Sequence, residues 1–148
     1  MKAPALIAAL ACALSCPLAG PATAEPIRLT DAVGRGVEIA RVPQRIVPIF
    51  ASNAELVAAL GLSERIVGVE AYTRFPPELT RKPQVGGRLG FSVDAIVAQR
   101  PDLLIVTPAR QAMHQLIDPM TRLGIPVIVL LARSVAEVIA LQPDRLSL

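Results

Sequence analysis

The chain has 148 residues, 53% of them apolar and 18% charged, a composition that suits one globular domain and argues against intrinsic disorder. Its formal net charge is +3, its arginines are scattered, and it contains only one tyrosine and three phenylalanines. A nucleic-acid-binding surface usually shows a basic stripe with interleaved aromatic residues. We therefore expect no nucleic-acid partner.

The chain begins with the layout of a cleavable secretory signal over residues 1–24. A basic residue precedes an apolar stretch from Ala5 to Leu14, and helix breakers and small residues then lead up to Ala24. The stretch is much shorter than the roughly 20 residues that a transmembrane helix needs. We expect cleavage after Ala24 and an exported domain over residues 25–148.

Both cysteines lie inside this leader, so the exported domain would depend on burial and not on disulfides. A lipid anchor on Cys12 or Cys16 is the alternative. The residues before both cysteines lack the branched side chain that is expected three places before a lipidated cysteine. Export as a soluble domain without a lipid anchor is therefore the favoured interpretation.

After the leader, two alternating runs flank Gly34-Arg35-Gly36 and predict a strand pair or hairpin. The rest of the chain alternates apolar runs with helical patterns. Strands are expected at "RIVPIF" (45–50), "RIVGVEA" (65–71), "LLIVT" (103–107) and "VIVLL" (127–131). Apolar strands separated by helices predict an α/β fold, with a mostly parallel sheet covered by helices on both faces.

The helices carry their own end signals. Ser52 and Glu55 predict a capping box for a helix that ends at Gly61. Ser92 predicts the cap of a second helix, which stops before Pro101.

A third helix is predicted over Met113–Leu123, but Pro119 would remove a backbone hydrogen bond inside it and cost about 3 kcal/mol. We expect a kink or break there, with Asp118 as the cap of the restarted helix. Ser134 and Glu137 predict another capping box further along.

A candidate binding site lies where the first predicted strand turns directly into a helix at Ser52 and Asn53. Backbone N–H groups and the positive helix end point outward at such a junction. In open parallel sheets the ligand crevice lies beyond the carboxyl ends of the strands. The ends of the second and third strands would add Tyr72, Arg74, Thr107 and Arg110 to the same edge. The alternative is that Ser52 merely caps its helix.

Other chemistries are not supported. The cluster "VGGRLG" (85–90) lacks the lysine and hydroxyl of a phosphate loop, so it is either a turn that holds Arg88 near the crevice or a plain structural turn. No "GxSxG" motif is present, and His114 has no obvious catalytic partner. No histidine, cysteine or carboxylate cluster has the spacing of a metal site. We expect no enzymatic activity and no resident cofactor or metal.

The order of several segments resembles the N-terminal lobe of periplasmic substrate-binding proteins, which serve ABC importers of iron-siderophores, haem and cobalamin. The segments, which span about Leu29 to Val138, are "TDAVGRGVEI", "PQRIVPIFASNAELVAALGLSERIVGV", "YTRFPPE", "QVGG", "SVDAIVAQRPDLLIV" and "RLGIPVIVL". Members of that family have two α/β lobes joined by a long helix and hold a metal complex between the lobes. The resemblance implies a single lobe here that ends at the start of the inter-lobe helix. The chain is then either a fragment of a gene, a frameshifted product or a genuine single lobe. One lobe supplies half a cleft, which predicts weak ligand binding.

The resemblance also implies roles for individual residues. Tyr72 matches an aromatic residue that lines the cleft of cobalamin-type members, and Ser52 and Asn53 match the turn that faces it. Arg88 and Thr107 fall at variable ligand-contacting positions. The full ligand-binding set is then Ser52, Asn53, Tyr72, Arg74, Arg88 and Thr107.

Asp94 matches an acidic position, usually glutamate, that docks onto arginines of the inner-membrane permease. Arg74 and Arg88 would suit an anionic ferric siderophore, and Tyr72 would suit a corrinoid. The absence of a tyrosine near Gly87 makes haem less favoured. The alternatives are an exported hydrolase, or an interaction module that touches only the permease.

Overall fold

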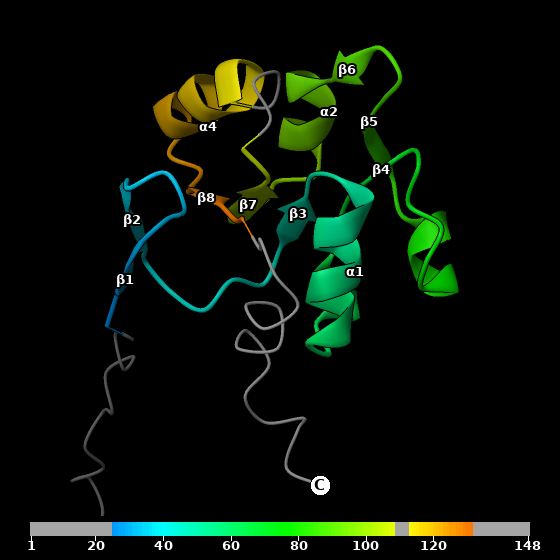
Figure 1. The fold of residues 1–148 in the computed structure, drawn as a ribbon, viewed down its shortest axis with the longest axis horizontal. Coiled ribbons are helices and arrows are strands. Elements are labelled where there is room, and N and C mark those ends of the chain that lie inside the picture. Colours follow the sequence, from blue (N-terminus) through cyan, green and yellow to red (C-terminus); the bar gives the residue numbers. More distant parts are fainter. Residues whose placement is uncertain (1–24, 109–112, 132–148) are drawn as a thin grey trace, which may run out of the picture.

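The computed structural model describes residues 25–108 and 113–131, which form an α/β lobe. Its centre is a parallel sheet with the strand order β3-β7-β8 (Figure 1). These strands arise from three of the predicted apolar runs, as Ile46–Pro48 (β3), Leu103–Val106 (β7) and Val127–Val129 (β8). The predicted α/β class and parallel sheet are confirmed. The leader expected over residues 1–24 and the capping box expected at Ser134 lie outside the described residues.

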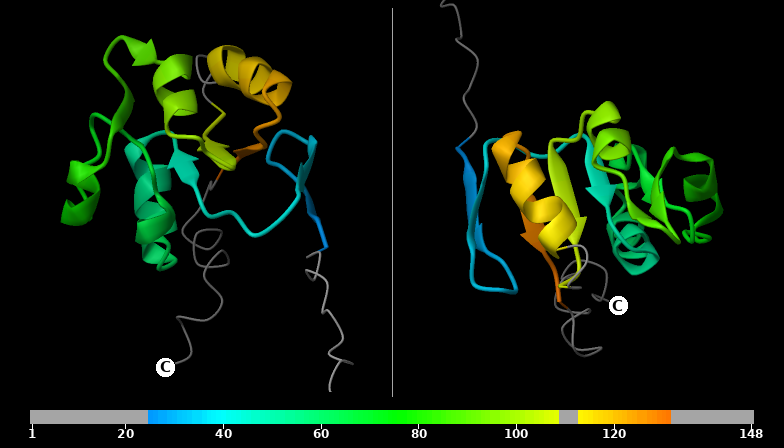
Figure 2. Two further views of the ribbon diagram at one scale, coloured as in Figure 1. Left: turned by 180° about the vertical axis from the view of Figure 1, so that it is seen from behind. Right: turned by 90° about the horizontal axis from the view of Figure 1, so that it is seen from above.

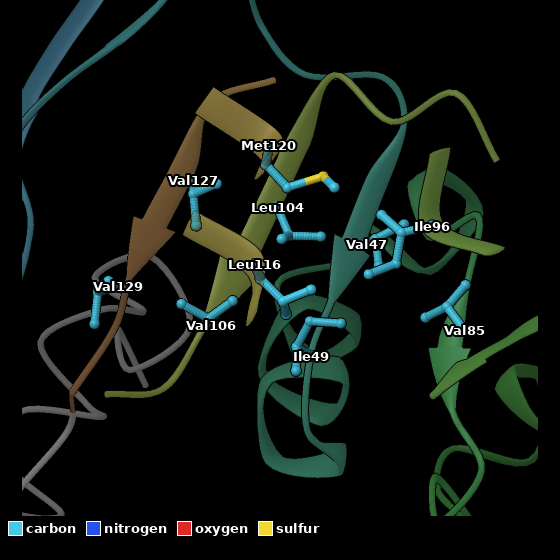
Figure 3. Packing of buried hydrophobic residues seen from close by; sticks show 10 residues of the cluster. All are labelled: Val47, Ile49, Val85, Ile96, Leu104, Val106, Leu116, Met120, Val127 and Val129. Atoms are coloured by element: carbon cyan, nitrogen blue, oxygen red, sulfur yellow. The ribbon is translucent and has the colours of Figure 1, made fainter. Parts of the chain in front are cut away.

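The central strands are buried on both faces because their side chains alternate between two apolar clusters. In β7, Leu104 and Val106 enter one cluster, and Leu103 and Ile105 enter the other. The first cluster, seen in Figure 3, consists of Val47, Ile49, Val85, Ile96, Leu104, Val106, Leu116, Met120, Val127 and Val129.

Helices cover both faces of the sheet, as Figure 2 shows from two sides. The first cluster is covered by α2 (Val93–Ala98), the π-helical turn η3 (Met113–Ile117) and α4 (Asp118–Arg122). The opposite face is covered by α1 (Ala51–Ala59), which buries Ala54 and Val57 there. The covering of both faces that the sequence predicted is therefore present.

Two of the predicted helix signals are confirmed. Gly61 adopts φ +79° just after α1 and donates to the Ala58 carbonyl over 2.8 Å, while Leu62 donates to the Val57 carbonyl over 3.2 Å. This pair of bonds is the Schellman arrangement, which favours glycine at the left-handed position. At α2, the Ser92 hydroxyl accepts a hydrogen bond from the Ala95 N–H over 3.1 Å, as a helix cap does.

The second predicted strand is only partly formed. Ile66 makes a parallel bridge to Ile46, and the chain then pairs as β4 (Val69–Glu70) with β5 (Gln84–Gly87). β5 turns back antiparallel into β6 (Gly90–Phe91), so that "VGGRLG" is a hairpin with Arg88 and Leu89 in its turn. Two short 3₁₀ helices, η1 (Ser63–Arg65) and η2 (Pro77–Arg81), lie in the connections on either side of β4.

A kink or break was predicted at Pro119, but the helix is not interrupted there. It changes from the π-helical turn η3 to α4 at Asp118, which places Pro119 in the first turn of α4. The prediction that Asp118 caps the restarted helix is wrong. Ile117 holds the capping position in helical geometry and makes no side-chain bond, because η3 runs into α4 without an intervening turn.

The predicted N-terminal hairpin consists of β1 (Ile27–Thr30) and β2 (Gly36–Ile39), paired antiparallel. Its loop is held by Asp31, whose carboxylate accepts bonds from the Val33 and Arg35 N–H groups and from the Arg35 guanidinium. The same guanidinium donates to the Val127 carbonyl over 3.0 Å and so joins the loop to β8. Burial would raise the pKa of Asp31, but these hydrogen bonds and the positive charge of Arg35 outweigh it and lower that pKa.

We expect Asp31→Ala to lower the free energy of unfolding by about 2–4 kcal/mol, because it leaves the Arg35 charge and two loop N–H groups without their acceptor. Since the pKa of Asp31 is lowered in the fold, its contribution is complete above the unfolded-state value of about 3.9 and is lost as the pH falls through the folded-state value. Urea denaturation at several pH values measures this loss.

Glu38→Ala is the matched control, since Glu38 pairs with Arg28 over 2.9 Å on the same hairpin but with both side chains exposed. That variant should lose less than about 1 kcal/mol. Equal losses in the two variants would show that the Asp31 cluster does not anchor the loop.

Candidate functional site

The order of the strands reverses at β3. From β3 the chain passes through α1 to β4 on one side, and the later strand β7 lies on the other side of β3. α1 covers one face of the sheet, and α2 and α4 cover the other (Figure 2). In open α/β sheets, ligands bind beyond the carboxyl ends of the strands at such a switch point.

We call the surface formed by the residues that follow β3, β4, β5 and β7 the rim. It comprises Phe50–Asn53, Ala71–Arg74, Arg88 and Thr107.

Asn53 and Thr107 meet at the centre of the rim. The Asn53 side chain is buried, and its Nδ2 donates to the Thr107 hydroxyl over 3.1 Å and to the Ile49 carbonyl over 2.6 Å. Asn53 is the third residue of α1, the helix that follows β3, and Thr107 directly follows β7. Two residues placed on this edge by strand-end reasoning are therefore in direct contact.

The predicted capping box of Ser52 and Glu55 is wrong. Phe50 holds the capping position with φ +73° and ψ +142°, so α1 begins at Ala51 and Ser52 is already its second residue, exposed and making no capping bond. The Phe50 carbonyl accepts from the Asn53 and Ala54 N–H groups over 3.1 and 3.2 Å. The backbone thus satisfies the donors that a capping side chain would have taken.

Phe50 is in a backbone region that residues other than glycine rarely enter, at a cost of about 1–3 kcal/mol. Its ring packs edge-to-face against Phe91 of β6, with the ring centroids 5.5 Å apart and the planes at 84°. Gly86 makes room for this contact, because a Cβ there would lie 2.6 Å from the Phe91 ring. No feature of the sequence had marked Phe50 as special.

Glu70 is a second rim-side residue that sequence analysis missed. It ends β4 with only 9% of its surface exposed. Burial raises the pKa of Glu70, and a hydrogen bond from the backbone of Ala51, the first residue of α1, partly offsets that rise. The sequence feature that could have pointed to Glu70 is an acidic residue at the end of an otherwise apolar strand.

Tyr72 and Arg88 leave neighbouring strands at the same edge. β4 and β5 are parallel, and the Ala71 N–H donates to the Gly86 carbonyl over 2.9 Å, so the residues that follow emerge side by side. The Tyr72 side chain is 51% exposed, and Arg88 is exposed in the β5–β6 turn. Both side chains are accessible to a ligand.

The remaining candidates are placed differently. The Arg74 guanidinium donates to the Ala71 carbonyl over 2.7 Å, so part of its hydrogen-bonding capacity is used within its own loop. Asp94 is exposed in the first turn of α2, on the face of the sheet opposite α1. His114 is exposed in η3, and Arg110 lies outside the described residues.

Within residues 25–108 and 113–131, no group of three or more histidine, cysteine or carboxylate side chains is arranged to hold a metal ion. In the same part of the chain, none of the helices is long and apolar enough to cross a membrane.

Comparison with known proteins finds a match between residues 46–144 and the family described as "Periplasmic binding protein". The chain is 31% identical over 98 residues to the uncharacterized ABC transporter substrate-binding lipoprotein YvrC of Bacillus subtilis, covering 63% of this chain and 31% of the relative. It is 33% identical over 94 residues to the vitamin B12-binding protein of Salmonella choleraesuis, covering 64% and 34%.

Among solved structures, the heme binding protein HmuT superposes with a TM-score of 0.61 at 26% identity, covering 77% of this chain and 37% of HmuT. The chain therefore spans about a third of the length of the curated relatives that it matches.

The capping geometry leads to a prediction on a matched pair of serines. Ser92→Ala should lower the free energy of unfolding by about 1 kcal/mol, because it removes the acceptor of the Ala95 N–H. Ser52→Ala should change it by less than about 0.5 kcal/mol, because the Phe50 carbonyl serves the first turn of α1. Thermal and urea denaturation of both variants measure this. A larger loss of unfolding free energy in Ser52→Ala than in Ser92→Ala would show that Ser52 does cap α1.

Proposed function

Because the chain belongs to the periplasmic binding protein family, we propose that it is the substrate-binding component, or part of one, of an ABC importer that takes up a metal complex such as a ferric siderophore or cobalamin. The family consists of binding proteins and not of enzymes. In this proposal, residues 1–24 direct export and the lobe works in the periplasm. Since one relative is named a lipoprotein, an anchor on a leader cysteine is the alternative.

The observation that supports this function most directly is the joining of Asn53 to Thr107 at the switch point of the sheet. The bond fixes the ends of two strands and leaves Ser52 exposed beside them. Tyr72 and Arg88 add an aromatic face and a cation from the neighbouring strand ends. A rim of this kind offers polar anchoring at its centre and apolar and charged contacts around it, as ligand sites do.

Two cargo classes fit the exposed side chains. The Tyr72 ring would pack against the face of a corrinoid, and one relative is named a vitamin B12-binding protein. The Arg88 guanidinium would pair with an anionic ferric siderophore. Haem is less favoured because no tyrosine near Gly87 is available to bind the iron. All six residues of the predicted set, Ser52, Asn53, Tyr72, Arg74, Arg88 and Thr107, are proposed as ligand contacts.

The partner in the membrane would be the importer's permease, contacted through Asp94. Asp94 is exposed in the first turn of α2, so its carboxylate is available to arginines of a docking partner. Because α2 and α1 cover opposite faces of the sheet, docking and cargo binding would use separate surfaces.

Tyr72→Ala should weaken binding of cyanocobalamin roughly tenfold, because it removes the exposed aromatic face of the rim. Isothermal titration of the purified chain measures this, and wild-type affinity should itself be weak, since one lobe leaves much of the ligand in water. Tyr72→Phe should retain most of the affinity.

Val42→Ala is the control, because Val42 is exposed to the same extent, 51%, but precedes β3 and so lies at the opposite edge of the sheet. If the Tyr72 and Val42 substitutions changed the affinity for cyanocobalamin equally, Tyr72 would not be a ligand contact. Sub-micromolar binding by the wild type would contradict the expectation of an open, one-sided site.

Asp94→Ala should weaken association with the permease roughly tenfold, because it removes an acceptor for the permease arginines, and should leave cargo affinity unchanged. Co-purification with the permease in detergent, combined with the titration above, measures both. Asp118→Ala is the matched control, an exposed acid in the first turn of α4 on the same face of the sheet. Parallel loss of docking and cargo binding in Asp94→Ala would show that the two surfaces are not separate.

A further inference from the structure

The strands of the central sheet all begin at one edge of the lobe. β3, β7 and β8 are parallel, and Ile66, which precedes β4, joins Ile46 of β3 through a parallel bridge. The segments that lead into β3, β7 and β8 therefore lie along the same side, as the view from above in Figure 2 shows. We call the five residues before each of these strand starts the amino edge. It consists of residues 41–45, 61–65, 98–102 and 122–126.

The amino edge is rich in arginine. Its arginines are scattered along the sequence, but the parallel strands bring them to one side of the lobe. Since neighbouring strands lie about 4.8 Å apart, the row of strand starts that carries them is about 15 Å long. Four of these arginines are exposed, and Arg65 is half-buried. The five are Arg41, Arg45, Arg65, Arg100 and Arg122, and the acids of the amino edge are Glu64 and Asp102.

Two of the arginines are held in place by backbone carbonyls. The Arg45 guanidinium donates to the Gln99 carbonyl over 2.6 Å and to the Arg100 carbonyl over 3.0 Å. The Arg65 guanidinium donates to the Pro43 carbonyl over 2.9 Å. Carbonyl groups orient these side chains but leave their positive charges in place. The contacts also show that the segments before β3, β4 and β7 lie against one another.

None of the five arginines forms an ion pair with another described residue. The two ion pairs found in residues 25–108 and 113–131 both belong to the N-terminal hairpin. The Asp102 carboxylate accepts from the backbone N–H groups of Gln44 and Arg45 over 2.8–3.1 Å, so it serves the backbone. Five cations against two acids leave the amino edge with a net charge of +3.

Exposed apolar side chains lie beside these cations. Val42 is 51% exposed next to Arg41, and Leu123 is 55% exposed next to Arg122. Cations together with exposed apolar groups suit the interface of an anionic membrane, where the cations face the phosphates and the apolar groups enter the headgroup region. A surface for single-stranded nucleic acid would instead offer aromatic side chains for stacking, and the sequence of the amino edge contains none.

We propose that the amino edge binds the surface of an anionic phospholipid membrane. The inference goes beyond the proposed function, because it assigns a second binding surface to the lobe. The rim lies at the carboxyl ends of the same strands, so a lobe that rests on lipid through the amino edge keeps its rim toward water. Cargo can then reach the rim while the lobe is held at the membrane.

The test is cosedimentation of the purified chain with lipid vesicles. One set of vesicles is an equal mixture of phosphatidylglycerol and phosphatidylcholine, and the other is phosphatidylcholine alone. The chain should bind the anionic vesicles at least roughly tenfold more tightly, and this preference should fall as salt is added, because counterions screen the arginines. Equal binding to both sets of vesicles would overturn the proposal.

The decisive variant combines Arg41→Gln with Arg100→Gln. Within the described residues neither side chain makes a hydrogen bond or an ion pair, so the fold should be unaffected. Binding to the anionic vesicles should weaken roughly twentyfold, because each cation near such a surface contributes roughly fivefold. Arg41→Lys combined with Arg100→Lys should retain most of the affinity. Wild-type affinity in the glutamine variant would contradict the role of the amino edge.

Arg74→Gln combined with Arg88→Gln is the matched control, since it removes two charges at the carboxyl edge of the sheet. Its affinity for the anionic vesicles should stay within about twofold of the wild type, because screening limits the reach of a charge. Equal losses in the two glutamine variants would show that net charge and not the amino edge is responsible. All variants carry the same residues 1–24, so any contribution of that segment cancels.

A soluble polyanion separates lipid from an acidic protein partner. Polyglutamate offers the same negative charge without an apolar layer, so the wild type should bind it at least roughly tenfold more weakly than the anionic vesicles. Equal affinity for polyglutamate and the vesicles would identify an acidic polypeptide as the partner and overturn the assignment to lipid.

Discussion

The burial of β3 on both faces constrains the whole lobe. Val47 contributes to one apolar cluster and Ile46 to the other, so helices must cover the strand on both sides. At its carboxyl end the chain passes through only two residues, Ile49 and Phe50, before α1 begins. The edge at which the strand ends becomes the place where side chains from several strand ends meet.

The rim is held together by contacts at the start of α1. The Phe50 carbonyl accepts bonds from the first turn of α1, and the Asn53 side chain donates to the Ile49 carbonyl and the Thr107 hydroxyl. Phe50 remains in an unfavourable backbone region because its ring is packed against Phe91 and its carbonyl accepts two bonds. These contacts fix the positions of Asn53 and Thr107 at the centre of the rim.

Sequence patterns predicted what depends on local chemistry. The apolar runs of β3, β7 and β8, the cap at Ser92 and the glycine end of α1 all follow from residue type and spacing. The capping box failed because the start of α1 depends on the positive φ of Phe50, which distant packing stabilises. The second strand was shorter than predicted, because only Val69 and Glu70 pair fully with β5. Glu70 was missed because its burial depends on the docking of α1 against β4, which no local pattern encodes.

The N-terminal hairpin has a consequence beyond its own stability. β8 is an edge strand of the central sheet, and the hairpin loop bonds to its outward carbonyls. The Val129 carbonyl accepts from the Ala32 N–H over 3.0 Å, and the Val127 carbonyl accepts from Arg35. A border strand with free carbonyls invites strands from other molecules to add to it. The loop therefore protects β8 against aggregation, because it occupies the edge of β8 to which a strand of another molecule would pair.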